Sequence, residues 1–175
     1  EMSGKVRVIS EKHIKTPPSL KNIFKEIKIF QPEAYEDYRG ELWTTYKKDE
    51  FPIELNFNHD KISTSRKNVF RGIHGDNKSW KLVTCLYGDL YFVVVDYRKE
   101  SKTFLEWDWI ILNDKNKKMV LLPPNFGNSF CVLSNYSIFM YKWSYEGSYA
   151  DVDEQFSLKW NDPRLNINWP IKNPI

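Results

Sequence analysis

Residues 70–96 read FRGIHGDNKSWKLVTCLYGDLYFVVVD, and this stretch decides the fold class. Two runs of alternating apolar and polar side chains flank His74, and Lys81 opens the second run. Such alternation is typical of β-strands. Outward from this stretch, similar runs recur about every eight to twelve residues, separated by turn-forming residues. This spacing indicates an all-β sandwich or barrel.

The predicted strands share β-branched or aromatic residues between Gly, Pro, Asn or Asp turns. They cover residues 25–30, 40–46, 81–88, 90–97, 105–112, 119–124, 129–134 and 137–143. The Pro-rich stretch at residues 160–175, WNDPRLNINWPIKNPI, is predicted to run irregularly over the surface. A chain of 175 residues is long enough for one full core, so a single domain over 1–175 is expected.

The charge is mild, because 26 Lys and Arg against 23 Asp and Glu give a net charge of +3. This small, scattered excess favours a small anionic ligand such as a nucleotide and argues against nucleic acid. No apolar run approaches the about 18 residues of a membrane helix, so we expect no membrane partner and a cytoplasmic location. Cys85 and Cys131 lie in apolar runs and are predicted to be buried free thiols.

Metal and cofactor sites are not indicated. The chain has three histidines, and His74 is followed by Gly75 and Asp76, so the H-x-H pair of metal-binding jelly rolls is missing. No C-x-x-C, P-loop or G-x-G-x-x-G pattern is present. We therefore expect no metal and no cofactor.

The remaining polar residues suit proton transfer. A histidine titrates near neutral pH, so His74 can act as a base. Lys81 can hold positive charge beside a developing oxyanion, and a tyrosine elsewhere can donate a proton from the opposite side. This trio suits removal of a proton next to a carbonyl, followed by reprotonation of the enolate. The alternative on spacing alone is that His74 and Lys81 are ordinary structural residues.

Several blocks together resemble one enzyme family. They are EDYRGELW (36–43), NVFRGIHGD (68–76), KLVTCLYGDLYFVVVDYRKES (81–101), LLPPNFGNSF (121–130) and WNDPRLNINWP (160–170). In this order, over roughly residues 28–171, they resemble the dTDP-4-dehydrorhamnose 3,5-epimerase family. The resemblance implies a cupin-type jelly roll (double-stranded β-helix), no cofactor, and epimerisation of a nucleotide-linked 4-keto-6-deoxy sugar.

The same resemblance assigns roles by position. His74 matches the base that removes the proton at C3 or C5, Lys81 the lysine that stabilises the enolate oxygen, and Tyr141 the acid on the other face. Arg71 and Arg39 match arginines that bind the diphosphate, the second reaching in from a partner subunit. Guanidinium groups suit phosphate oxygens because their donors form a fork. Family members pair as homodimers with exchanged N-terminal strands, so a homodimer is expected.

Departures from the family pattern lie where the sugar and the nucleotide are expected to bind. Asn128 stands where a second active-site histidine is common, and His59 and Lys61 replace a glutamine and an asparagine. Tyr149 matches a substrate-contacting tyrosine if a two-residue insertion is allowed. These residues are expected to bind sugar or nucleotide. More closely, the blocks HDK (59–61), RGIHGD (71–76), PPNFGNS (123–129) and YEGSYADVDEQF (145–156) resemble the branch acting on GDP-linked 4-keto-6-deoxy-heptoses in bacterial capsule synthesis.

Three questions stay open from the sequence. The family aspartate that orients the base histidine is absent up to Ile175, and Asp60 and Asp96 are both candidates for its role. Whether C3, C5 or both are inverted is not encoded in a motif. The substrate alternatives are a dTDP-4-keto-6-deoxy-hexose or the 3,4-ketoisomerase reaction, and the alternative of another class is an inactive jelly roll that only binds nucleotide sugars.

Overall fold

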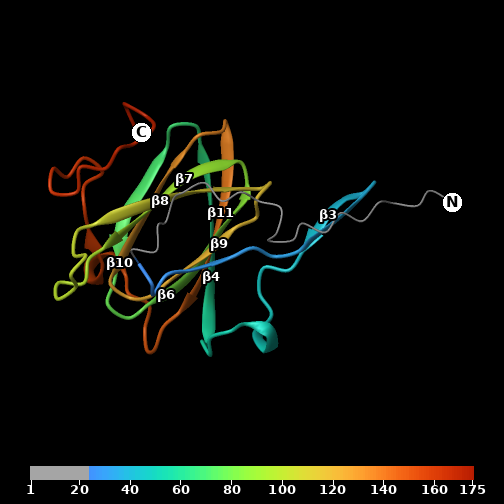
Figure 1. The fold of residues 1–175 in the computed structure, drawn as a ribbon, viewed down its shortest axis with the longest axis horizontal. Helices are drawn as coiled ribbons and strands as arrows, with labels where there is room; N and C mark the ends of the chain where they lie inside the picture. The colour runs from blue at the N-terminus through green and yellow to red at the C-terminus, as the bar shows by residue number, and fades with distance from the viewer. Residues whose placement is uncertain (1–23) are drawn as a thin grey trace.

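A computed structural model describes residues 24–175. Its strands form two five-stranded antiparallel sheets and one hairpin (Figure 1). The first sheet contains, in spatial order, β1 (Lys28–Phe30), β9 (Met119–Leu122), β6 (Trp80–Tyr87), β11 (Tyr136–Ser144) and β4 (Phe57–Arg66). The second contains β12 (Phe156–Ser157), β5 (Phe70–Gly75), β10 (Phe126–Val132), β7 (Asp89–Asp96) and β8 (Trp107–Asn113). The hairpin is β2 (Ala34–Asp37) with β3 (Gly40–Trp43), and two 3₁₀ turns are η2 (Lys48–Glu50) and η3 (Val152–Glu154). The all-β prediction is confirmed.

The main core lies between the two sheets, where alternate side chains of facing strands meet. Strand β7 is apolar almost throughout because both of its faces are covered. Residues 90–95 are all buried, and alternate ones enter the core between the sheets and a second cluster on the outer face. Cys85 and Cys131 are buried and free, as predicted.

The C-terminal segment covers the outer face of the second sheet. Leu158 and Leu165 are buried in the outer cluster, and Trp169 packs edge-on against Phe70 with ring centroids 5.0 Å apart. The Trp169 Nε1–H donates a hydrogen bond of 2.7 Å to the carbonyl of Trp160. The prediction that residues 160–175 run irregularly is confirmed, and their apolar residues serve to cover β5, β7 and β10.

Each predicted strand overlaps an observed one, but β2, β4, β5 and β12 lie outside the predicted ranges. The longest of these is β4. Its sequence, FNHDKISTSR, carries few apolar residues. As an edge strand it exposes Asp60, Ile62 and Thr64 on one face, and its other face contributes Lys61 and Ser63 to a cavity rather than to the core. Strand β4 therefore lacks the alternation of apolar and polar residues by which the other strands were predicted.

The β2–β3 hairpin projects from the sandwich (Figure 1). Beside β3 the Nζ of buried Lys117 lies 2.9 Å from Glu41 Oε2 and 4.7 Å from the centre of the Trp43 ring. At its tip Arg39 forms an ion pair with Asp37. The predicted homodimer with exchanged N-terminal strands stays a prediction, and residues 1–23 lie outside the described part of the chain.

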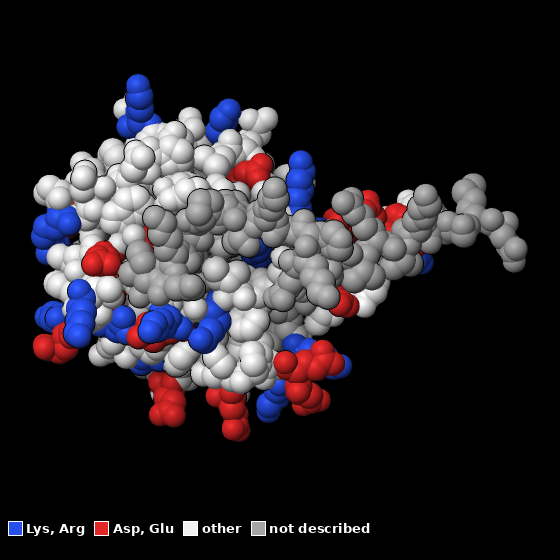
Figure 2. Space-filling model, in the orientation of Figure 1, with Lys and Arg blue, Asp and Glu red and all other residues white. Residues whose placement is uncertain are grey.

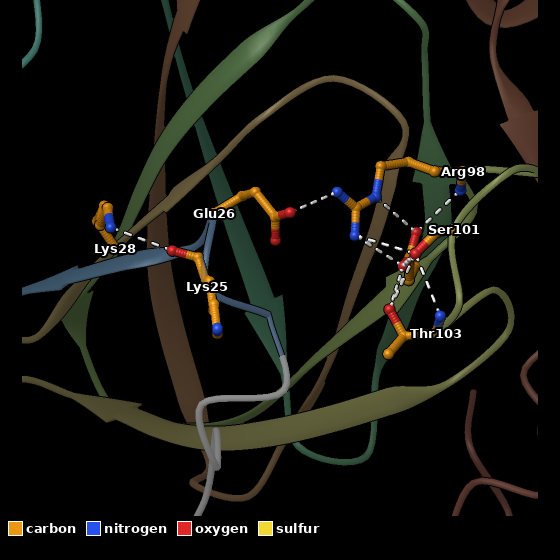
Figure 3. Close-up of polar contacts among 7 residues, drawn as sticks. Lys25, Glu26, Lys28, Arg98, Ser101 and Thr103 are labelled. Atoms are coloured by element: carbon orange, nitrogen blue, oxygen red, sulfur yellow. Dashed lines mark hydrogen bonds and ion pairs between the residues drawn. The ribbon is translucent and has the colours of Figure 1, made fainter.

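A polar network joins the loop after β7 to the segment before β1 (Figure 3). The fully buried Asp96 carboxylate accepts hydrogen bonds from Arg98 at 2.9 Å, Ser101 at 2.7 Å and Thr103 at 2.6 Å. Arg98 also donates to Glu26 at 2.8 Å. Hydrogen bonds and positive charge stabilise the ionised carboxylate, so burial does not neutralise it.

The face shown in Figure 2 carries Lys and Arg interspersed with Asp and Glu. The visible described surface therefore presents both signs of charge rather than a patch of one sign. Within residues 24–175, no helix has the length and apolar character needed to span a bilayer.

Candidate active site

A cavity of about 430 Å³ opens where the apolar core between the sheets gives way to polar residues. Its position follows from strand alternation: Lys81 points to the same side of β6 as the core residue Val83, and Tyr141 to the same side of β11 as Phe139. The residues lining it are Lys61, Ser63, Phe70, Arg71, Gly72, His74, Lys81, Asn128, Tyr141, Trp143, Tyr149 and Gln155. The described lining therefore includes Lys and Arg but no carboxylate.

The first sheet forms one wall of the cavity. Trp143 of β11 pairs with His59 of β4 on one side and with Lys81 of β6 on the other. Two residues along β11, Tyr141 pairs with Lys61. Directly paired residues share a face of the sheet, so these five side chains form one surface. The Lys81 Nζ lies 4.5 Å from the centre of the Trp143 ring, a cation–π contact.

The second sheet forms the opposite wall. His74 of β5 pairs with Asn128 of β10, whose amide donates to the His74 carbonyl at 3.3 Å. The strand pairing shifts between Asn128 and Ser129, a bulge-like irregularity that turns β5 locally. Gly72 has a φ of 109°, and a side chain there would lie 2.5 Å from the Asn128 carbonyl. Only glycine fits this approach, which brings His74 to the cavity.

Burial shifts the pKa values of three cavity groups. The pKa of His74 is lowered by burial and by the nearby positive charge of Lys81. Burial lowers the pKa of Lys81 to about 8, with Asp76 opposing the shift and Lys61 adding to it. Burial also holds the pKa of Tyr141 well above its usual value. At neutral pH the cavity therefore holds an available base, a titratable cation and a protonated phenol.

Lys61 and Tyr149 form a pair at the cavity rim. The Lys61 Nζ donates to the Tyr149 hydroxyl at 2.9 Å and lies 4.7 Å from the centre of its ring. His59 packs beside them, with its ring centre 5.0 Å from that of Tyr149, although it does not line the cavity itself. Gln155 donates a hydrogen bond of 2.8 Å to the Ala150 carbonyl and so links the two residues that flank η3.

Arg71 is held by the neighbouring edge strand β4. Its Nε donates to Ser65 Oγ at 2.8 Å and its Nη2 to the Thr64 carbonyl at 3.2 Å. These bonds use part of the guanidinium and direct the rest into the cavity lining. Such an arrangement leaves donors for an anionic ligand.

The structure brings together most of the predicted site residues at this cavity. Arg39 lies on the projecting hairpin and does not line the cavity of its own chain, so its predicted contact from a partner subunit stays a prediction. Neither candidate carboxylate orients His74, because Asp60 pairs with Lys142 and Asp96 with Arg98.

The atom found beside the histidine is instead a hydroxyl. The His74 Nδ1 lies 3.0 Å from the Ser157 Oγ. Sequence reasoning also missed Trp143 and Gln155 as lining residues. The strand alternation that placed Tyr141 would also have placed Trp143, two residues further on.

Within residues 24–175, no group of three or more His, Cys, Asp or Glu side chains is arranged to hold a metal ion.

Comparison with known proteins gives a consistent result. The family model described as dTDP-4-dehydrorhamnose 3,5-epimerase matches residues 21–175. A Salmonella typhimurium protein of the same name is 35% identical over 159 residues, covering 87% of this chain and 85% of the relative.

Two crystal structures extend the likeness to the fold. A Legionella pneumophila 3,5-epimerase in complex with dTDP-4-keto-L-rhamnose has a TM-score of 0.79, 30% identity, and covers 98% of this chain and 87% of its own. A Bacillus anthracis dTDP-4-dehydrorhamnose 3,5-epimerase with TDP and pyrophosphate bound has a TM-score of 0.80 and 30% identity. The match covers 98% of this chain and 94% of the Bacillus chain. The cupin-type jelly roll is therefore confirmed.

Proposed function

The chain belongs to the dTDP-4-dehydrorhamnose 3,5-epimerase family, and we propose that it epimerises a nucleoside-diphosphate-linked 4-keto-6-deoxy sugar without a cofactor. One observation carries this proposal. His74 and Tyr141 enter a single cavity from facing sheets. An epimerase must remove a proton from one face of a carbon and return one to the other face, and groups on opposite walls suit that task.

The first step is removal of a proton by His74. The C4 carbonyl of the sugar acidifies the hydrogens on C3 and C5, so a neutral imidazole can take one of them and leave an enolate. The negative charge collects on the C4 oxygen. Lys81, buried on the opposite wall beside Trp143, is the cation proposed to stabilise that oxygen.

The second step is donation of a proton by Tyr141 from the other face of the enolate. Its raised pKa keeps the phenol protonated until the reaction requires it, and Arg71 opposes the effect of burial by favouring the phenolate. Inversion then results because the carbon loses its proton toward one sheet and gains one from the other.

The nucleotide part is assigned by charge. Arg71 lies at the cavity with free donor capacity, which suits a diphosphate oxygen. Arg39 is proposed to supply a second contact from the hairpin of a partner subunit. Sedimentation or size measurement in solution would contradict this role by showing a monomer at working concentrations.

The relatives favour a dTDP-linked hexose over the GDP-linked heptose expected from the sequence. The names of the Salmonella, Legionella and Bacillus proteins all specify dTDP-sugars. His59, Lys61 and Asn128, the departures that suggested a different substrate, lie at or beside the cavity. The GDP-heptose assignment stays a prediction, and capsule synthesis stays one with it.

Hydrogen exchange tests the reaction directly. Supply dTDP-4-keto-6-deoxyglucose and, separately, GDP-4-keto-6-deoxy-heptose in deuterium oxide, and follow deuterium at C3 and C5 with product configuration by NMR. We expect incorporation with inversion for one of them. Absence of both exchange and inversion for both substrates, with tight binding retained, would support the non-catalytic jelly roll. Movement of the carbonyl would support the 3,4-ketoisomerase.

Two variants test the roles of base and acid. His74→Asn should lower exchange and inversion together by about 10²–10⁴-fold, the usual contribution of a general base. Tyr141→Phe should retain exchange but lose net inversion, since the enolate still forms and is reprotonated by the base side. Lys142→Gln, on the outer face of the same strand as Tyr141, is the matched control and should behave as wild type. Wild-type rates in His74→Asn would contradict the mechanism.

A further inference from the structure

Trp143 connects the strands that form one wall of the cavity. Across the first sheet it pairs with His59 of β4 on one side and with Lys81 of β6 on the other. Its ring lies nearly parallel to that of His59, with the ring centres 6.0 Å apart. The ring of Tyr149 packs edge-on against it at 5.3 Å, and Trp143 is only 4% exposed. These neighbours on three segments of the chain therefore hold the indole in one orientation.

The ammonium group of Lys81 lies over this ring. Its Nζ is 4.5 Å from the ring centre of Trp143, and Lys81 itself is buried. Among residues 24–175, the Nζ has neither a hydrogen-bond acceptor nor a carboxylate at ion-pair distance. A buried ammonium without such partners is costly. The negative face of an aromatic ring offsets part of that cost, and tryptophan does so best among the aromatic side chains.

We propose that Trp143 is the positioning residue for Lys81: the face of its indole ring keeps the ammonium group charged and in place at the cavity, where it can stabilise an enolate oxygen. This inference rests on the proposed epimerase function. A carboxylate partner would occupy the N–H donors of Lys81 and cancel its charge. A ring face attracts the cation without carrying a net charge, so the positive charge stays available to the substrate.

The other charges around Lys81 act in both directions. The titratable side chains that face it from β4, β5, β11 and the segments after β5 and β11 are Lys61, Arg71, His74, Asp76, Tyr141 and Tyr149. Burial, the largest effect, lowers the pKa of Lys81 to about 8, while Asp76 favours the ammonium and Lys61 opposes it. The ring face works against burial. Weakening that face should therefore lower the pKa further.

The first test changes the electron density of the ring while keeping its shape, and it needs no substrate. Fluorine withdraws electrons from the ring face, so growth with mono-, di- and trifluorinated tryptophan should lower the pKa of Lys81 step by step. The ¹³Cε chemical shift of Lys81 against pH in the unliganded protein measures this, with the signal assigned by Lys81→Arg.

The Trp143→Phe protein grown with the same analogues is the matched control, because it carries fluorine on all the other tryptophans. Its Lys81 pKa should not change with the number of fluorine atoms. A Lys81 pKa that does not fall with fluorination of the wild-type chain, or that falls equally in Trp143→Phe, overturns the proposal.

The second test measures kcat/KM against pH. Trp143→Leu removes the ring face but keeps an apolar side chain, and should move the alkaline limb down by about one unit; Trp143→Phe, with a weaker face, should move it less. At pH 8 the Leu variant should lose about fivefold in rate, and at pH 6.5 it should lose little. A loss of the same size at every pH would show a packing role only and overturn the proposal.

Trp109→Leu is the control for the kinetic test. Trp109 is packed on the outer face of the second sheet, stacked on Tyr91 with ring centres 5.0 Å apart, and does not line the cavity. Its replacement removes a packed indole of the same size without touching Lys81. The alkaline limb of this variant should stay where it is in wild type.

The two hypotheses fail separately. An unchanged Lys81 titration across the fluorinated series overturns the role of Trp143 while leaving the epimerase assignment intact. The expected titration in a protein that exchanges no hydrogen of any nucleotide-linked 4-keto sugar overturns the epimerase assignment instead.

Discussion

Lys81 shows at the residue scale how burial sets reactivity in this cavity. Its side chain is 3% exposed, and within residues 24–175 no carboxylate lies at ion-pair distance from it. A buried ammonium loses hydration, so the pKa falls to about 8 even though Asp76 raises it. Near pH 8 Lys81 is therefore present both as the cation and as the neutral amine. The negative charge of an enolate oxygen would favour the cation.

The pH–rate profile should be bell-shaped. Activity requires neutral His74, whose pKa is below 6.5, so the acid limb should lie below that value. It also requires protonated Lys81, so the alkaline limb should lie near pH 8. Lys61→Gln removes a like charge and should move the alkaline limb upward, as measured by kcat/KM against pH. Lys142→Gln serves as control, and an unmoved limb in Lys61→Gln would contradict this electrostatic assignment.

Single residues of the site were predictable only where they belong to a recognisable block of sequence. His74, Lys81 and Tyr141 lie in such blocks, and the structure places all three at one cavity. Ser157 does not, because its contact with His74 depends on the pairing of β12 with a strand that lies 83 residues earlier. A serine in a polar stretch carries no signal of that contact.

At the scale of elements, the strongly apolar strands were predictable and the polar ones were not. Strand β7 is buried on both faces, so its sequence is a continuous apolar run. Strand β4 lines the cavity on one face and solvent on the other, so it has no apolar alternation to detect. Strand β4 is thus hard to detect because polar cavity residues replace core residues along it, whereas β6 and β11 line the cavity at one end only and were predicted from their apolar residues.

The loop after β7 makes a separate prediction about stability. Burial raises the pKa of Asp96, but the hydrogen bonds from Arg98, Thr103 and Ser101 outweigh it and lower the pKa from 3.8 to about 2 (Figure 3). The ionised carboxylate therefore stabilises the fold above about pH 4, and this contribution is lost as the pH falls toward 2. This lowering of the pKa corresponds to a contribution of about 2 kcal/mol to the free energy of unfolding at neutral pH.

Asp96→Asn should accordingly lower the free energy of unfolding at pH 7 by about 2–4 kcal/mol, because Arg98 also loses its buried partner. Urea unfolding between pH 7 and pH 2.5 measures this, and the gap between variant and wild type should narrow as the pH falls. Asp162→Asn, which breaks an exposed pair with Arg164, is the matched control and should change little. A gap independent of pH would contradict the linkage.

At the scale of the whole molecule, three apolar clusters hold the sheets and their coverings together. The segment after β12 closes the outer face of the second sheet, and its Ile175 exchanges backbone hydrogen bonds with Asn68 and Phe70 at 3.0 Å each. The sequence predicted that this segment is irregular, but not that it packs on the strand bearing His74. That packing is between residues far apart in the sequence, so the local sequence pattern does not predict it.

Leu165→Ala tests this long-range coupling. Leu165 is 4% exposed, so its truncation should lower the free energy of unfolding by about 2–5 kcal/mol. It should also lower kcat of the folded enzyme, because the segment follows directly after β12, which pairs with β5 beside His74. Leu112→Ala, in the core between the sheets, should lose similar stability but retain kcat. Equal kcat losses in the two variants, measured well below their unfolding temperatures, would show that the segment has no special connection to the site.

The pairing of β12 with β5 also has a consequence for biosynthesis. A ribosome makes the chain in one direction, so β5 emerges long before residues 156–175 that complete its edge and cover its outer face. Until then a nascent chain exposes an unpaired strand edge and an apolar surface, both of which favour association with other chains. Among the described strands β12 is the last to be translated, so His74 gains this neighbour only after the strands that line the cavity have been made.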